Sequence, residues 1–307
     1  MPPNGRGVGI TEMLHGAADW PVLVLFALLT QLGDAWFLFA LGSVLYVTGD
    51  RRWLGIDRRR GLFVLGVALS YVVLIGVLKN AFMLPRPPGA GEPPPVGWVP
   101  PVLEPVLTSI TTGDGSGFPS GHALGTTMVW GGVALVLDRG SSRLRLGLAT
   151  GVVVLVSLSR LVLGVHYAVD VVAGVAVGGG VLVGLYRLAD GGTAPGRVFL
   201  LAVVVGSVGL FVGTTLDSVM ALGGAVGGWF GWRAVAERTP VHPSDRRAAI
   251  VAVVVGGAAG AFFGAVYALT PSLGVGFLGA VVAAVGVVAA PAVGERLVDL
   301  TPRRSPG

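Results

Sequence analysis

The sequence predicts an all-α integral membrane protein, and three observations carry this prediction. Hydrophobic residues make up 53% of the 307 positions and charged residues only 12%, whereas a soluble protein carries about 25% charged residues. The 51 glycines suit helices that pack closely within a membrane. Apolar runs of about 20 residues, long enough to cross the hydrocarbon layer, recur along the chain. With no cysteine, disulfides, thiolate metal sites and thiol nucleophiles are excluded.

Nine apolar runs predict about nine membrane spans. They lie near 33–49, 61–84, 120–138, 146–163, 167–187, 198–214, 217–235, 248–269 and 273–293. Residues 20–31 are too short to span alone, so we expect an interfacial or re-entrant helix that leads into the first span. Residues 1–19 contain Arg6, Glu12 and Asp19 and do not read as a signal peptide.

The basic residues predict the orientation of these spans. All but four of the 21 lysines and arginines fall in connections on one side of the nine spans, which the positive-inside rule makes cytoplasmic. The net charge of +5 therefore belongs to membrane-flanking loops, and no nucleic-acid partner is expected. The four exceptions are Arg6, Lys79, Arg86 and Arg160.

The first polar patch on the opposite, extracytoplasmic side is "KNAFMLPRP". It holds Lys79, the single lysine of the chain, and Arg86 directly after Pro85. A snorkelling lysine at a helix end is the simpler reading, but a lone lysine among so many arginines favours a specific need for a compact ammonium group. The proline-rich stretch that follows, up to Pro119, cannot be one continuous helix and is expected to form a stiff external cap.

The second patch, "FPSGH", directly precedes an apolar run. Ser120 suits a helix N-cap, and the backbone N–H groups of Ser120 and Gly121 can then face an anion. His122 follows in the first turn. An ordinary capped helix with an incidental histidine is the alternative.

The third patch is "SRLVLGVHYAVD", residues 159–170. His166 and Asp170 are four residues apart, so on a helix the carboxylate can hold the imidazole. Arg160 is six residues before His166, and the two converge only if the chain breaks between them, for which Gly164 is suited. A structural Arg–Asp pair is the alternative.

Together the patches place Lys79, Arg86 and Arg160 around two histidines. Three cations without matching acids suit a multiply charged anion, and phosphate fits best. His166, oriented by Asp170, is then a nucleophile for phosphorus, and His122 is a general acid and later a base. We expect neither a metal ion nor another cofactor.

The patterns K-x6-R-P (79–87), P-S-G-H (119–122) and S-R-x5-H-x3-D (159–170) resemble, in order, the signature of the type 2 phosphatidic acid phosphatase (PAP2) superfamily. This superfamily includes lipid phosphate phosphatases and is related to undecaprenyl-pyrophosphate phosphatases and vanadium haloperoxidases. The resemblance covers roughly residues 20–190 and implies an all-helical core and a metal-independent phosphohistidine mechanism. By resemblance, His166, Asp170 and His122 are catalytic, and the phosphate-binding positions are Lys79, Arg86, Ser120, Gly121 and Arg160.

The resulting prediction is a multi-pass cell-membrane phosphatase with three parts. An N-terminal segment (1–32) precedes a PAP2-like catalytic core (33–190) and an extension of about four spans with no assigned role (191–307). The expected substrate is a lipid phosphate or diphosphate on the extracytoplasmic side, the expected partners are membrane lipids, and a homo-oligomer is possible. The alternatives are a lipid phosphotransferase with an alcohol acceptor and a non-enzymatic transporter of anionic lipids.

Overall fold

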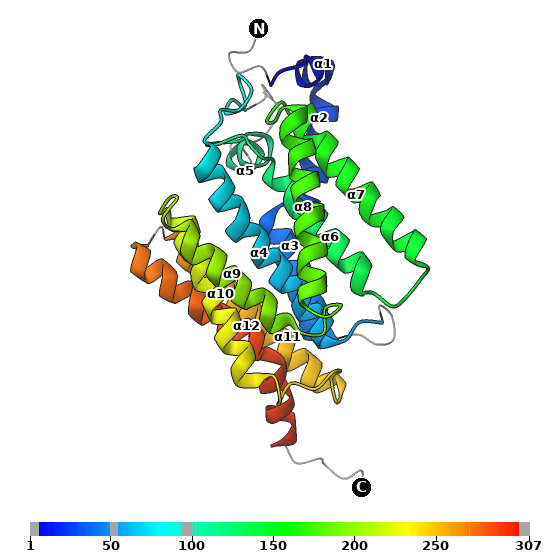
Figure 1. The fold of residues 1–307 in the computed structure, drawn as a ribbon, viewed down its shortest axis with the longest axis vertical. Helices are drawn as coiled ribbons and strands as arrows, with labels where there is room; N and C mark the ends of the chain where they lie inside the picture. Colours follow the sequence, from blue (N-terminus) through cyan, green and yellow to red (C-terminus); the bar gives the residue numbers. More distant parts are fainter. Residues whose placement is uncertain are drawn as a thin grey trace.

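The computed structural model describes residues 6–49, 55–93, 100, 102, 104–269 and 271–300, and within these ranges the structure is helical and has no strand. Figure 1 shows its elements. They are α1 (Ile10–Gly16), α2 (Trp20–Leu29), η1 (Thr30–Gly33), α3 (Ala35–Thr48), α4 (Arg58–Phe82), α5 (Glu104–Thr111), α6 (Gly121–Val136), α7 (Ser142–Val162), α8 (Ala168–Leu188), α9 (Pro195–Gly209), α10 (Leu216–Val235), α11 (Arg246–Ala268) and α12 (Leu273–Asp299).

Each of the nine predicted apolar runs coincides with one helix, namely α3, α4 and α6 to α12. Among the described helices, α4, α7, α8, α11 and α12 are long and apolar enough to cross a membrane. The apolar helices α3 and α9 are shorter, with 14 and 15 residues. The all-helical fold of a multi-pass membrane protein is thus confirmed, while the number of nine crossings stays a prediction.

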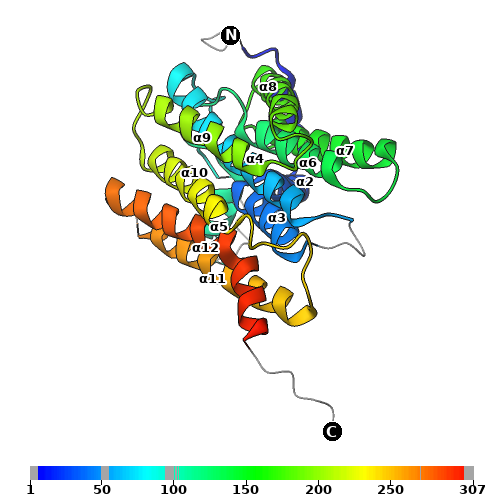
Figure 2. The same cartoon turned by 60° about the horizontal axis from the view of Figure 1, so that its bottom comes forward.

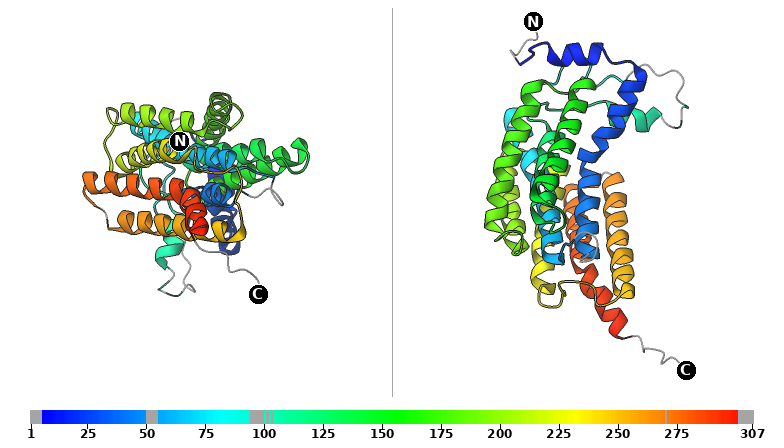
Figure 3. Two further views of the ribbon diagram at one scale, coloured as in Figure 1. Left: turned by 90° about the horizontal axis from the view of Figure 1, so that it is seen from below. Right: turned by 90° about the vertical axis from the view of Figure 1, so that its right-hand side faces the viewer.

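Residues 20–31 form α2 and the start of η1, and they lead directly into α3. The axis bends by 119° between α1 and the helix of residues 20–33, so α1 lies across one end of the molecule while α2 and α3 run along it (Figure 3, right). The helix breaks at Asp34, whose side chain accepts a hydrogen bond from the Trp36 N–H and so caps α3. Two polar residues, Thr30 and Asp34, therefore occupy a break between two apolar helices.

Helix α4 is the centre of the fold because both of its faces are buried. One face packs Phe63, Val67 and Tyr71 against α6. The other packs Leu62 and Leu69 against α9 and α10. Figure 2 accordingly shows α6 to α8 on one side of α4 and α9 to α12 on the other.

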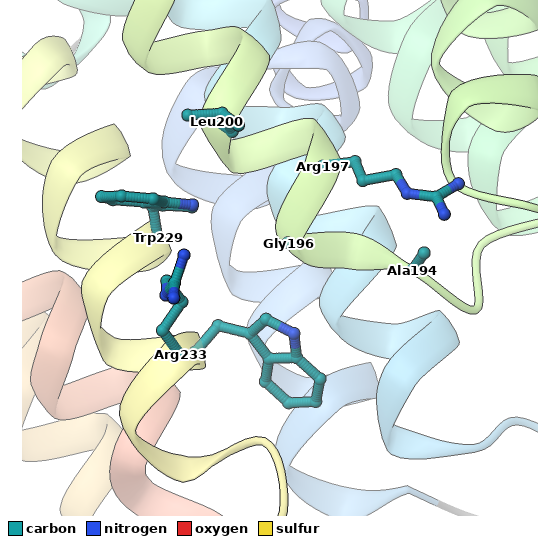
Figure 4. Close-up of a pocket in the computed structure, with 7 residues that line it drawn as sticks. Ala194, Gly196, Arg197, Leu200, Trp229 and Arg233 are labelled. Atoms are coloured by element: carbon teal, nitrogen blue, oxygen red, sulfur yellow. The ribbon is translucent and has the colours of Figure 1, made fainter.

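A shallow pocket of about 280 Å³ lies between α9 and α10 (Figure 4). Its walls include two tryptophans and two arginines, Trp229, Trp232, Arg197 and Arg233. These residues lie near the start of α9 and the end of α10, among the arginines that the sequence assigns to the cytoplasmic side. None of the predicted site residues lines this pocket.

Candidate active site

Two glycines of α8 let this helix approach the start of α6. A Cβ atom at Gly174 would lie 2.7 Å from the backbone oxygen of Ser120, and one at Gly178 would lie 2.8 Å from that of Leu124. Since real side chains do not tolerate such distances, glycine is needed at both positions. The close approach also lets the Ser120 N–H donate to the backbone oxygen of Asp170 at 2.9 Å. The second and third sequence patches are thereby joined at one end of the molecule.

The predicted chain break between Arg160 and His166 is confirmed. Helix α7 ends at Val162 and α8 begins at Ala168. Between them, Gly164 adopts a φ of 72°, in the left-handed region that favours glycine. The turn of residues 163–167 allows Arg160 and His166, which would lie on different faces of one continuous helix, to face the same buried region.

The hydrogen-bond partners of His166 define which ring nitrogen carries the proton. His166 is 1% exposed, and its Nε2 lies 3.1 Å from Nη1 of Arg86. Because a guanidinium group only donates, Nε2 accepts this hydrogen bond and the proton is on Nδ1. That Nδ1 lies 3.6 Å from Oδ2 of Asp170 and has no hydrogen-bond partner among the described residues. The Nε2 side of the ring therefore faces Arg86, and the Nδ1 side faces Asp170.

Burial, together with the neighbouring charges of Arg86, Arg160 and Lys79, holds the pKa of His166 well below its ordinary value. His166 is consequently neutral near pH 7. A neutral imidazole is the form that can attack phosphorus.

The first patch reaches the same region. Lys79 is in the last turn of α4, and the loop that follows carries Arg86. Arg86 donates through Nε to the backbone oxygen of Asp114 at 3.0 Å and through Nη1 to that of Val165 at 2.9 Å. Gly113 makes room for it, because a Cβ there would lie 2.7 Å from Nη1.

All three cations act electrostatically on both histidines. The structure thus brings together the predicted cations Lys79, Arg86 and Arg160 and the predicted histidines His122 and His166. This is the set of groups that can hold an anion between two imidazoles.

Ser120 and Gly121 stand at the start of α6, as the sequence predicts. Ser120 is the N-cap, with its Oγ 3.5 Å from the Ala123 N–H. Its own N–H, expected to face an anion, is instead engaged by the Asp170 backbone oxygen. The N–H of Gly121 and the Ser120 hydroxyl group are the donors that remain at this end of α6 for the predicted anion.

The break between α2 and α3 supplies two site residues that sequence reasoning missed. Oδ2 of Asp34 lies 3.7 Å from Nε2 of His122, and the Thr30 hydroxyl accepts a 3.0 Å hydrogen bond from Nη1 of Arg160. Arg160 itself is only 4% exposed. The sequence signal for these residues was weak, since it consisted only of polar side chains in a short interruption of an apolar run.

A third missed residue is Arg6, whose Nη1 lies 2.6 Å from Oδ1 of Asp170. A signal for it did exist, because Arg6 is one of the four basic residues on the side where the positive-inside rule does not call for them.

Within the described part of the chain, no three His, Asp or Glu side chains are arranged to hold a metal ion. The acidic residues of the site, Asp34 and Asp170, each pair with a different histidine. The prediction that the reaction needs no metal stays a prediction.

The fold is that of an all-helical, multi-pass membrane protein, and its candidate site consists of three cations around two histidines. Residues 60–193 match the family model described as the PAP2 superfamily, so this part of the chain carries a PAP2 domain, and the resemblance seen in the sequence is confirmed for it. No curated protein and no solved structure matches the chain at a significant level.

The matched region contains all eight predicted site residues. It begins after Thr30 and Asp34 and long after Arg6. The match over these residues supports a phosphoester hydrolase in general.

Proposed function

We propose that this protein is a membrane phosphatase that hydrolyses a lipid phosphate or diphosphate through a phosphohistidine, without a metal ion. One observation carries the proposal: His166 is neutral, buried and presents the lone pair of Nε2 to a cluster of three cations. Cations placed around a phosphoryl group stabilise the charge that spreads over its oxygens during transfer.

In the first step the Nε2 lone pair of His166 attacks phosphorus, and the bond from phosphorus to the leaving oxygen breaks. His122, protonated once the anionic phosphate is bound beside it, gives its proton to that oxygen. Arg86, which donates to Nε2 in the free protein, turns its N–H groups toward the phosphate oxygens when substrate binds. Asp170 stabilises the positive charge that develops on the His166 ring.

In the second step His122 takes a proton from water, and the water oxygen attacks phosphorus. The P–N bond breaks, inorganic phosphate leaves, and His166 returns to its neutral form. Protons and electrons balance over the two steps, because the proton given to the leaving oxygen is recovered from water.

A lipid substrate is supported by the position of the site in a chain of apolar helices. A cavity of about 440 Å³ lies next to the turn that carries His166, although none of the predicted site residues lines it. Leu23, Pro88 and Leu163 contribute apolar walls, and Gly164, two residues before His166, borders it. We assign this cavity to the part of the lipid nearest the phosphate.

The test is phosphate release by the purified protein in detergent with EDTA. The substrates are a polyprenyl diphosphate, a phosphatidic acid and a phosphatidylglycerophosphate, and each is run beside His166→Ala. We expect release from at least one lipid, its loss in the variant, and a radiolabelled phosphoenzyme that is stable to base and labile to acid. Undiminished release by His166→Ala would exclude the mechanism.

We also propose that the site faces the extracytoplasmic side of the cell membrane. Because the chain has no cysteine, single cysteines report topology without background. Ser109 is exposed on α5, on the side of the site, and is replaced in the variant Ser109→Cys. Ser142 is exposed at the start of α7, at the end of that helix away from the site, and is replaced in Ser142→Cys. In intact cells a membrane-impermeant maleimide should label the first variant and spare the second, and the reverse pattern would invert the proposed orientation.

A further inference from the structure

Residues 6–16, which include α1, contact the turn that carries His166. Helix α1 lies at the end of the molecule opposite to the C-terminal end of α12 (Figure 1). The Thr11 hydroxyl donates to the backbone oxygen of His166 at 3.0 Å, and Nδ1 of His15 lies 2.9 Å from that of Val162. A Cβ atom added at Gly164 would lie only 3.0 Å from Cγ of His15, so the His15 ring packs directly against this glycine. This segment therefore contacts the turn at its beginning, middle and end.

Arg6 makes the most polar of these contacts. Its Nη1 donates to Oδ1 of Asp170 at 2.6 Å, its Nη2 donates to the backbone oxygen of Pro85, and its guanidinium group lies over the Tyr167 ring at 5.2 Å. The Arg6 side chain is 12% exposed and that of Asp170 is 0% exposed. A charge-assisted pair so shielded from water is stronger than a surface ion pair.

The contacts of Arg6 fix the Asp170 carboxylate from one side. Oδ1 accepts from Arg6, while Oδ2 accepts from the Tyr167 N–H at 2.9 Å. With one donor on each oxygen the carboxylate cannot rotate. In this orientation Oδ2 lies 3.6 Å from Nδ1 of His166.

We infer that Arg6 is a positioning residue of the proposed reaction, which acts by holding Asp170 against His166 and by tying the Arg86 loop to the start of α8. The inference rests on the proposed function. Arg6 acts through Asp170 and through the backbone next to Arg86, not on the phosphate itself.

The geometry distinguishes this role from that of an inhibitory contact. An arginine that withheld Asp170 would turn the carboxylate away from His166. Here the oxygen bound by Arg6 is Oδ1, and the oxygen nearest to His166 is Oδ2. Removing Arg6 frees the carboxylate to rotate, so activity falls instead of rising.

The test compares the kinetics of Arg6→Ala, Arg6→Gln and Arg6→Lys with those of the full-length parent, with phosphatidic acid among the substrates of the panel. We expect kcat to fall about 10- to 100-fold in the first two variants, as for a catalytic group misplaced by about 1 Å, with KM within about 2-fold of the parent. Arg6→Lys should retain part of the activity. Added guanidinium ion, below denaturing concentrations, should raise kcat of Arg6→Ala.

The matched control is Arg143→Ala, which removes an exposed arginine at the opposite end of α7 and should match the parent, with no response to guanidinium. Thr11→Val gives a second variant in the same segment and should lower kcat by a smaller factor. An Arg6→Ala protein that is monodisperse and as active as the parent, or more active, overturns the inference and leaves the proposed function standing. A parent protein that releases no phosphate from any lipid overturns both.

Discussion

Oδ2 of Asp34 lies 3.7 Å from Nε2 of His122, so each histidine of the site has its own carboxylate. The two pairs differ in their surroundings. Asp170 is fully buried, whereas the Asp34 side chain is 36% exposed. The more exposed pair belongs to the histidine that, in the proposed reaction, exchanges protons with the leaving group and then with water, a role that needs access to solvent.

Replacing Asp34 should therefore impair proton transfer. We expect Asp34→Asn to lower kcat by about 10-fold or more, within the range that a general acid contributes. Stability should stay near that of the parent, because asparagine caps α3 as well as aspartate does. The control is Asp57→Asn, which alters the equivalent cap of α4 and should keep full activity. Equal kcat values for Asp34→Asn and the parent would remove Asp34 from the mechanism.

Thr30 should affect substrate binding more than turnover. Thr30→Val keeps the shape of the side chain but leaves Nη1 of Arg160 without its 3.0 Å acceptor. A hydrogen bond to a charged group is worth about 1.5 kcal/mol, which corresponds to a rise of about 10-fold in KM for a phosphate-binding arginine. Steady-state kinetics in detergent would measure this, with Thr193→Val, in an exposed loop, as the control. A KM equal to that of the parent would show that Thr30 does not position Arg160.

The pH dependence should reflect the lowered pKa of His166. Attack needs the neutral ring, and a lowered pKa keeps the ring neutral to a lower pH, so the acid limb of kcat/KM from this group should lie below about pH 6.5. Arg86→Gln removes a cation that lowers the pKa of His166 and should move the limb to higher pH. Residual phosphate release, measured across the acid range with a sensitive assay, tests both statements. A limb of the parent centred above about pH 7 would contradict them.

Because α6 and α8 approach closely, we expect two glycine-to-alanine variants of α8 to differ in thermal stability. Gly174→Ala places a Cβ 2.7 Å from the Ser120 oxygen, and the overpacking should cost about 1–3 kcal/mol of stability. It should also separate His122 from Asp170 and lower kcat. Gly180→Ala, in the same helix, meets nothing within 4 Å and should be neutral or slightly stabilising. Thermal unfolding in detergent would compare the two, and similar melting temperatures would refute the packing argument.

The sequence predicted those parts of the molecule that depend on local patterns. Apolar runs located nine helices, and the spacing of Arg160 and His166 required a break that Gly164 provides. These inferences succeeded because helix length and the angle between residues follow from the chain itself. The cations could be assembled because three of them stand on the side where membrane topology does not call for them.

The contacts that the sequence did not predict are long-range. Arg6 meets Asp170 across 164 positions and Thr30 meets Arg160 across 130, and no periodic pattern marks such pairs. The hydrogen bond that the Ser120 N–H donates to the backbone oxygen of Asp170 also joins residues far apart in the sequence. It depends on how closely α8 approaches α6, which the individual glycines allow but do not reveal.

The contact between Arg6 and the site has a practical consequence for anyone who prepares this protein. An affinity tag or reporter joined close to Arg6 would lie near Asp170, and a loss of turnover in such a fusion would be mistaken for a property of the protein itself. Helix α12 ends at Asp299, and its C-terminal end lies at the opposite end of the molecule (Figure 1). Purification handles are best attached after residue 307, and a cleavable leader should be removed before any rate is measured.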